Sequence, residues 1–174
     1  MTSSDVLLDA FGRIPEMVHS VIDGLTPEDL TLRLDSEANS IAWLVWHLTR
    51  IADDHVSEVA SHPQVWISDG WAKRWRLPLD QADTGYGHTA QEVAAVTGAS
   101  DLLRGYFDAV QEMTVGFVRT LSDADLDRIV DERWDPPVTL GVRLVSVAGH
   151  NFEQVAQAAF IRGIIERRHR RRER

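Results

Sequence analysis

Amphipathic helical periodicity is the feature that most constrains the fold of this chain. Apolar residues recur at steps of three and four, the spacing that lines one face of an α-helix, in four segments: 5–23, 39–60, 100–121 and 139–164. Pro15 lies inside the first segment and is expected to kink or divide that helix, because proline lacks a backbone N–H. No segment shows a convincing strand pattern. The sequence therefore predicts an all-α fold.

A short internal repeat indicates how the four helices are arranged. Leu25–Leu30 follows the first helix, and Leu121–Leu126 follows the third. Both consist of Leu, a Thr or Ser cap, two further residues, Asp and Leu, so each predicts a short capped turn before an extended link. Two such halves predict a pseudo-twofold four-helix bundle with one long crossover at 61–98. Within the crossover, the capping box Thr-Ala-Gln-Glu at 89–92 predicts a short helix.

The crossover at 61–98 is longer than most connections in compact domains, and such loops usually serve as lids or pocket walls. It contains three of the six tryptophans, Trp66, Trp71 and Trp75, and a turn-rich segment at 83–88. The lid interpretation places this crossover over a functional site. The alternative is that its tryptophans only plug one end of the bundle.

Composition limits the chemistry that the chain can perform. Its 174 residues, 44 % of them hydrophobic, suffice for one domain, expected over 1–166 with an Arg-rich tail at 167–174. The absence of cysteine excludes disulfides, thiolate metal sites and a cysteine nucleophile. No apolar run approaches the roughly 20 residues of a membrane span, and the N-terminus lacks a signal-peptide pattern. We therefore expect a cytoplasmic protein without a membrane partner.

The net charge of −9 is unevenly distributed. Residues 1–166 carry 12 basic and 26 acidic side chains, whereas six Arg lie among the last eight positions. Such an acidic body predicts no nucleic-acid partner, because binding depends on Lys and Arg that neutralise phosphates. We interpret the tail as a solvated helix end whose cations suit the C-terminal dipole. The alternative, nucleic-acid binding through the tail, predicts a salt dependence that truncation at Glu166 abolishes.

Tryptophans that look exposed favour a homodimer.

Two of the seven histidines lie in the middle of long amphipathic helices. His47 lies eight residues into the second helix, and His150 lies at a comparable depth in the fourth. These helices follow the matched turns of the two halves, so we expect them to face each other. A single buried histidine is more often a hydrogen-bonded core residue than a ligand. Two that meet need partners, since each unsatisfied buried polar atom costs about 1–3 kcal/mol, and a divalent metal satisfies both.

Further donors accompany both histidines. Gln154 follows His150 by four residues, one turn along the same face. Asp54 lies about 20° from the bearing of His47, and His55 lies about 80° from it. The predicted metal ligands are therefore His47, His150 and Gln154, with Asp54 and His55 as weaker candidates. Imidazole and oxygen donors suit Zn²⁺, Ni²⁺, Mn²⁺ or Fe²⁺, and the sequence does not choose between these ions.

Three segments resemble a known family. The sequence IAWLVWHLTR at 41–50, followed by DDH at 53–55, resembles the second helix of the DinB/YfiT-like metalloenzyme superfamily, and HNFEQVAQAAFIRG at 150–163 resembles its fourth helix. This resemblance covers nearly the whole chain. The loop ADTGYGHT at 82–89 resembles an actinobacterial branch related to mycothiol-dependent maleylpyruvate isomerases and thiol-S-transferases.

The resemblance implies a four-helix bundle with a divalent metal held by one His on the second helix and two ligands on the fourth. The matching positions here are His47, His150 and Gln154. The family usually has His at the third position, and a neutral amide is a weaker ligand for transition metals than imidazole. The resemblance further implies that the metal activates the thiol of a low-molecular-weight cofactor such as mycothiol.

These observations favour a metal-dependent thiol transferase or isomerase that acts on a small-molecule substrate. Trp43, Arg143 and Arg162 are candidate substrate- or cofactor-binding residues, although surface solvation is the commoner role of such arginines. The alternative is a degenerate, non-catalytic bundle that acts as a binding or regulatory module with a weakened metal site.

Overall fold

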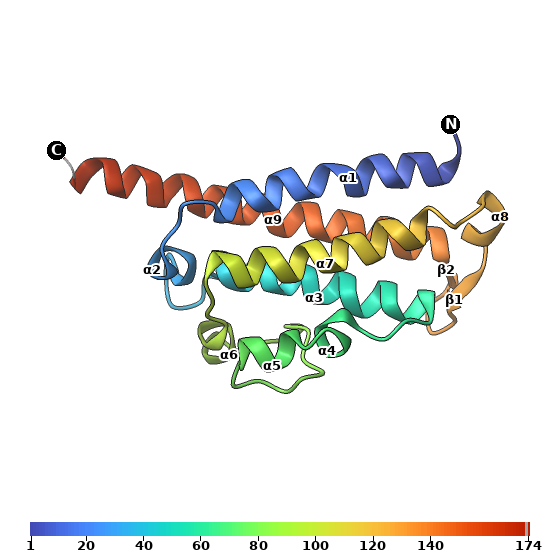
Figure 1. Ribbon diagram of the computed structural model, residues 1–174, viewed down its shortest axis with the longest axis horizontal. Helices are drawn as coiled ribbons and strands as arrows, with labels where there is room; N and C mark the ends of the chain where they lie inside the picture. The colour runs from blue at the N-terminus through green and yellow to red at the C-terminus, as the bar shows by residue number, and fades with distance from the viewer. Residues whose placement is uncertain (173) are drawn as a thin grey trace.

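The computed structural model describes residues 1–172 and 174, and 67 % of the chain is helical. Four long helices pack around one core, as predicted (Figure 1): α1 (Ser3–Ile22), α3 (Ile41–Ala60), α7 (Ser100–Val118) and α9 (Leu140–Arg172). The third helix ends three residues earlier than expected, at Val118. The fourth continues through most of the Arg-rich tail, so residues 167–172 form the end of α9, as the interpretation of the tail as a helix end predicted.

Short elements connect the long helices. They are α2 (Pro27–Thr31), α4 (Val65–Ser68), α5 (Trp71–Trp75), α6 (Ala90–Ala95), α8 (Asp123–Leu126), β1 (Ile129–Asp131) and β2 (Val138–Thr139). The predicted capping box at Thr89 is present, and the predicted caps Thr26 and Ser122 form capping boxes as well. The strands form an antiparallel hairpin that pairs Ile129 with Thr139. The expectation of no strand was wrong here, because a three-residue strand is too short to show an alternating pattern.

Proline 15 neither divides nor ends α1, which is helical from Ser3 to Ile22. The missing N–H of Pro15 leaves the carbonyl of Phe11 without its usual helical partner. Gln111 of α7 supplies the replacement, since its Nε2 donates to Phe11 O at 2.9 Å. The expected break is therefore prevented by a side chain from a neighbouring helix.

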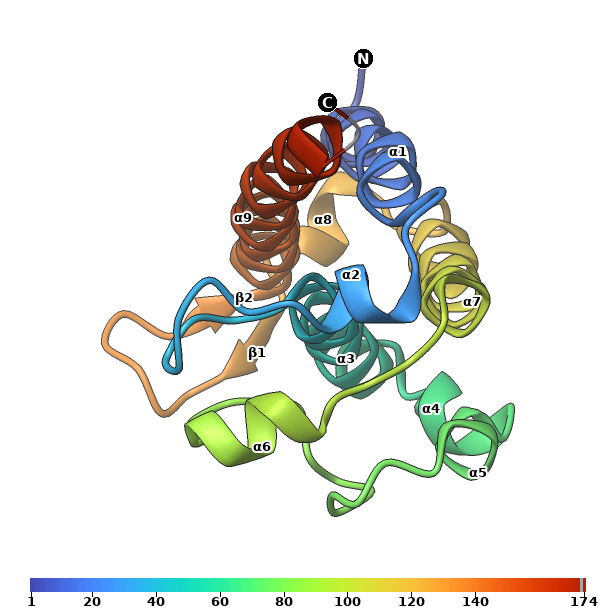
Figure 2. The ribbon, with the colours of Figure 1, turned by 90° about the vertical axis from the view of Figure 1, so that its left-hand side faces the viewer.

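Helix α3 occupies the centre of the molecule. Fifteen of its twenty residues are buried, because α1, α7 and α9 cover one side and the crossover helices α4–α6 lie outside the other (Figure 2). A helix that is apolar on most faces is stable only when it is covered on most faces. The crossover therefore completes the core around α3.

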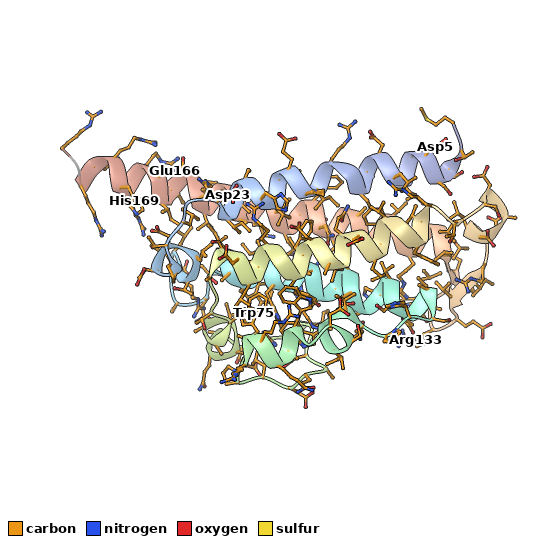
Figure 3. The ribbon with its side chains drawn as sticks, in the orientation of Figure 1. Asp5, Asp23, Trp75, Arg133, Glu166 and His169 are labelled. Atoms are coloured by element: carbon orange, nitrogen blue, oxygen red, sulfur yellow. The ribbon has the colours of Figure 1, made fainter. Side chains whose placement is uncertain are left out.

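The tryptophans mostly belong to this core. Trp43, Trp46, Trp66 and Trp75 are buried, and Figure 3 shows Trp75 between α3 and the crossover helices. Trp134 is the residue of this type that is exposed, and Trp71 packs against the core. The expectation of several exposed tryptophans, on which the homodimer was predicted, was therefore wrong. The homodimer itself stays a prediction.

Candidate functional site

Helices α3 and α9 bring His47 and His150 together, as the pattern of the two halves predicted. Their ring centroids lie 4.9 Å apart in an edge-to-face arrangement. His47 is only 6 % exposed. Two imidazoles from different helices thus meet where little water reaches them.

A hydrogen bond determines the tautomer of His47. Its Nδ1 lies 2.6 Å from the backbone oxygen of Thr84, and because a carbonyl oxygen only accepts, Nδ1 carries the proton. The lone pair therefore lies on Nε2, the arrangement typical of a metal ligand or a general base. Burial lowers the pKa of His47 to about 4, and the neighbouring His150 and His88 act in the same direction. His47 is neutral at physiological pH.

Two polar atoms of half-buried α9 side chains at this position are buried without partners. His150 Nε2 and Gln154 Oε1 make no hydrogen bond with any residue that the structure describes. Burial also lowers the pKa of His150, and the adjacent His55 contributes to that shift. Each buried polar atom of this kind costs about 1–3 kcal/mol if nothing binds it. Two such atoms on residues one helical turn apart, with the His150 ring against that of His47, make this position a candidate ligand site.

Two residues of the crossover, Thr84 and Gly85, lie against His47, and the lid interpretation stays a prediction. Gly85 has a φ of +93°, and a Cβ at this position would lie 2.6 Å from His47 Nδ1 and 3.0 Å from the ring of Trp46. Only glycine therefore allows the backbone to approach closely enough for Thr84 to accept the His47 proton. The glycine is part of the mechanism that orients His47.

Aromatic side chains line the wall between the crossover and α3. Trp43 stacks on His47 at 4.4 Å between ring centroids, and Trp46 stacks on His88 at 5.7 Å. Trp43 Nε1 donates to His88 Nδ1 at 3.1 Å, so the His88 proton lies on Nε2. That atom is 3.2 Å from Asp83 Oδ1, close enough for attraction although the pair lacks hydrogen-bond geometry.

His88 lies in this wall next to His47, because it packs against Trp43 and Trp46. The two glycines that flank Tyr86 are the sequence signal that could have revealed it. Both have positive φ, and together they turn the loop back onto α3. Periodicity says nothing about loops, so His88 could not be assigned from helix faces.

A buried arginine network holds the crossover in place. Arg50 is fully buried, and its Nε donates to Asp83 O at 3.0 Å. Its Nη1 and Nη2 both donate to Gln64 Oε1 at 3.0 Å, and Nη1 also contacts Tyr106 Oη at 3.3 Å. Asp53 Oδ2 neutralises the charge at 3.5 Å. Because Asp83 precedes Thr84, this network positions the carbonyl that orients His47.

Asp53 connects the same network to α4. Its two carboxylate oxygens accept from the backbone N–H groups of Val65 at 2.8 Å and Trp66 at 2.7 Å. Tyr106 donates to Oδ2 at 2.8 Å, and burial raises the pKa of Tyr106. The motif Arg50-Ile-Ala-Asp53 therefore fixes the crossover at two places, residues 64–66 and Asp83, a role that sequence reasoning missed.

The weaker ligand candidates have other partners. Asp54 Oδ1 accepts from Gln64 Nε2 at 2.7 Å, and His55 Nδ1 lies 3.1 Å from Arg143 Nη1. Burial and the positive charge of Arg143 lower the pKa of His55, so this nitrogen accepts from Arg143. The three predicted ligands His47, His150 and Gln154 take no part in these two hydrogen bonds.

The arginine candidates are bound within the protein and not freely solvated. Arg143 pairs with Asp131 at 3.0 Å and contacts His55, while its Nε is buried without a partner in the described chain. Arg162 pairs with Glu166 at 2.9 Å and donates to the Asp23 carbonyl. Arg143 lies two turns before His150 on the same face of α9 and is the better placed of the two.

The predicted donor set comprises two imidazoles and one amide. In residues 1–172 and 174, no group of three or more His, Asp or Glu side chains gathers closely enough to hold a metal ion. The amide of Gln154, the predicted third donor, is of a residue type that such a group does not include.

No helix of the described chain is long and apolar enough to cross a membrane.

Comparison with known proteins agrees with this fold. A family model of the DinB superfamily matches residues 10–158. The chain belongs to the DinB superfamily. A solved structure described as a conserved protein from Enterococcus faecalis is similar to this DinB protein, with 26 % identity and a TM-score of 0.87 over 93 % of this chain and 96 % of the other. No curated protein matches the chain significantly. The more specific resemblance to an actinobacterial branch stays a prediction.

Proposed function

We propose that His47, His150 and Gln154 bind one divalent metal ion, and that the site supports a thiol-dependent transferase or isomerase reaction. The observation that carries this proposal is the pair of buried atoms without partners, His150 Nε2 and Gln154 Oε1. The His150 ring lies 4.9 Å from that of His47, whose tautomer leaves Nε2 free to bind. A bound cation offsets the cost of burying all three donors.

The chemistry of the donors fits a first-row divalent ion. Two neutral imidazoles suit Zn²⁺, Ni²⁺, Mn²⁺ or Fe²⁺, and an amide oxygen completes a neutral set with coordination positions left open for small ligands. Such an ion, when bound, acts as a Lewis acid that lowers the pKa of a thiol or water ligand. Because the chain has no cysteine, the thiol comes from a co-substrate of the mycothiol type.

The residues around the donors have separate roles. Thr84 holds the proton on Nδ1 of His47 and so directs Nε2 toward the site. Trp43 and the crossover limit access of water, which strengthens electrostatic interactions within the site. Arg143 offers a partly buried guanidinium to an anionic group of a small-molecule substrate. Arg162 is bound elsewhere and has no role in this proposal.

We place the reaction in the cytoplasm, where free thiols stay reduced.

Metal analysis of protein purified without a His tag tests the proposal. We expect stoichiometric metal in the wild type and none in a His47→Ala/His150→Ala variant. His62→Ala is the matched control, because His62 is exposed and lies outside the site. Equal metal content in the wild type and the double variant would overturn the proposal.

A degenerate binding or regulatory module is the second candidate, and the amide of Gln154 favours it. Gln154→His discriminates between the two, with metal affinity and thiol-transfer activity measured together. If the native site is catalytic, the wild type already shows activity that His47→Ala abolishes. If it is degenerate, the wild type is inactive and Gln154→His raises metal affinity strongly, since imidazole binds these ions better than an amide.

A further inference from the structure

The outward face of α9 carries a largely exposed apolar stripe. Val142 and Val145 within it are 57 % and 62 % exposed, and Phe160 beside it is 66 % exposed. Phe152 is half-buried, because it also packs against the core. The stripe follows alternating steps of three and four, the spacing of a helix-pairing seam, through these residues: Val142, Val145, Gly149, Phe152, Ala156, Ala159 and Gly163.

This face is depleted of charge, unlike the outward face of α1. Of the nine exposed residues from Val142 to Phe160, only Glu153 is charged. Of the eight exposed residues of α1 (Ser3–Ile22), four are charged, namely Asp5, Asp9, Arg13 and Glu16. Absence of charge with exposed aliphatic and aromatic side chains is typical of the centre of a protein interface.

A groove lies beside the stripe. It has a volume of about 560 Å³ between the 34–39 connection and α9, with Leu34, Ala38, Ala156 and Phe160 among its lining residues. The groove is large enough to receive apolar side chains from an adjacent helix. It therefore widens the contact surface beyond the helix itself.

The two ends of this stripe carry opposite charges. Beyond its C-terminal end, α9 projects past the rest of the bundle and carries five arginines over residues 167–172 (Figure 3). His169 fixes this extension by pairing with Asp29 at 3.0 Å. Beside the N-terminal end of α9 lies the segment 122–137, with six acidic and two basic residues.

We propose that a second copy of this chain docks on the stripe, with the two α9 helices antiparallel about a twofold axis near Phe152. This orientation places the arginines of each tail beside the acidic 122–137 segment of the partner copy, at both ends of the contact. A parallel pairing would instead place the tails together and the acidic segments together. Charge complementarity therefore selects the antiparallel arrangement.

The required area supports participation of the tails. From Val142 to Gly163 the stripe is about 30 Å long, and a helix about 10 Å wide then buries roughly 300 Å² per copy. Stable interfaces bury about 800 Å² per partner. The groove and the contact between each tail and the opposite hairpin supply the remaining area. Trp134, which is 65 % exposed at that hairpin, offers an aromatic face to an arginine.

Analytical ultracentrifugation tests the association. We expect a monomer–dimer equilibrium in the wild type and at least a tenfold weaker dimer for Val145→Glu. Val6→Glu is the control, because Val6 is an equally exposed valine on α1. A wild-type chain that stays monomeric up to millimolar concentration would overturn the proposal. So would a dimer that Val145→Glu and Val6→Glu affect equally.

Single cysteines test the orientation, since the chain has none of its own. Antiparallel pairing about Phe152 places Gly149 opposite Ala156 of the partner copy. We therefore expect a disulfide only when Gly149→Cys and Ala156→Cys proteins are mixed, because each alone holds its thiols about 10 Å apart along the axis. Disulfide formation by Gly149→Cys alone would show parallel pairing and overturn the proposal.

The contribution of the tail is tested by replacing Arg170–Arg172 with Gln, which keeps the His169 contact. We expect a weaker dimer whose dissociation constant depends less on salt than that of the wild type. The charge-matched control replaces the exposed Arg74, Arg76 and Arg119 with Gln. An unchanged dimer, or a monomer whose tail binds nucleic acid instead, would overturn the assignment of the tail.

Discussion

Replacement of Gly85 by Ala tests how the crossover controls His47. The new Cβ would lie 2.6 Å from His47 Nδ1, 3.0 Å from the Trp46 ring and 3.2 Å from the Trp43 ring. These rings are buried and packed, so they cannot move aside as a flexible exposed side chain would. We expect the Thr84–Gly85 backbone to shift and the hydrogen bond to His47 to be lost.

Gly87→Ala provides the matched control, because Gly87 has a similar φ of +75° and a Cβ added there would meet no atom within 4 Å. The positive φ costs about 1–3 kcal/mol in either variant. The collision adds about 1–3 kcal/mol for Gly85→Ala alone. That difference corresponds to a melting temperature about 2–12 °C lower than for Gly87→Ala, for a chain of this length.

The assay is thermal and urea denaturation of both variants, together with metal affinity. Gly85→Ala is expected to bind metal more weakly than Gly87→Ala, because His47 loses the acceptor that fixes its tautomer. If both variants were equally stable and bound metal equally, the close approach of Gly85 would have no role in orienting His47.

Three further perturbations follow from the same contacts. Gln111→Ala removes the donor to the Phe11 carbonyl, and we expect urea denaturation to show a free energy of unfolding lower by about 0.5–1.5 kcal/mol. Adding Pro15→Ala restores a backbone N–H and should recover this stability. A double variant that recovers none would contradict the role of Gln111. Tyr106→Phe removes a hydrogen bond from Asp53 and costs about 1–3 kcal/mol, and a fully stable variant would refute it. The pKa of His47 is about 4 in the folded protein, below the value of about 6.5 expected in the unfolded chain. As pH falls from about 6.5 to about 4, His47 is therefore protonated in the unfolded chain but not in the folded protein. The metal-free protein loses stability over this pH range. A His47→Gln variant lacks that component, and parallel stability curves for the two proteins would argue against a neutral buried His47.

The long helices could be predicted because their signal is local. An apolar residue every three or four positions is a property of each segment, and the caps at Thr26, Ser122 and Thr89 lie within four residues of the groups that they satisfy. The same periodicity placed His47 and His150 on inward faces. The repeat of the two halves then indicated that these faces meet.

Tertiary structure decided the features that depend on distant residues. Pro15 lies within a continuous helix in which Gln111 of α7 supplies the donor that the Phe11 carbonyl lacks. His88 and Gly85 join the site only because Arg50, on another element, fixes the backbone of Asp83. The extent of α9 likewise depends on packing, as His169 contacts Asp29 of α2.

The sequence by itself therefore determined the helices, their inward faces and the pair of histidines in the core of this DinB protein. Only the tertiary structure decided which atoms of that pair are free, because a hydrogen bond from a loop sets the tautomer of His47. It also decided that His150 Nε2 and Gln154 Oε1 are buried without partners. Periodicity fixes the direction of a side chain, but the availability of its lone pairs depends on neighbours that the chain brings from elsewhere.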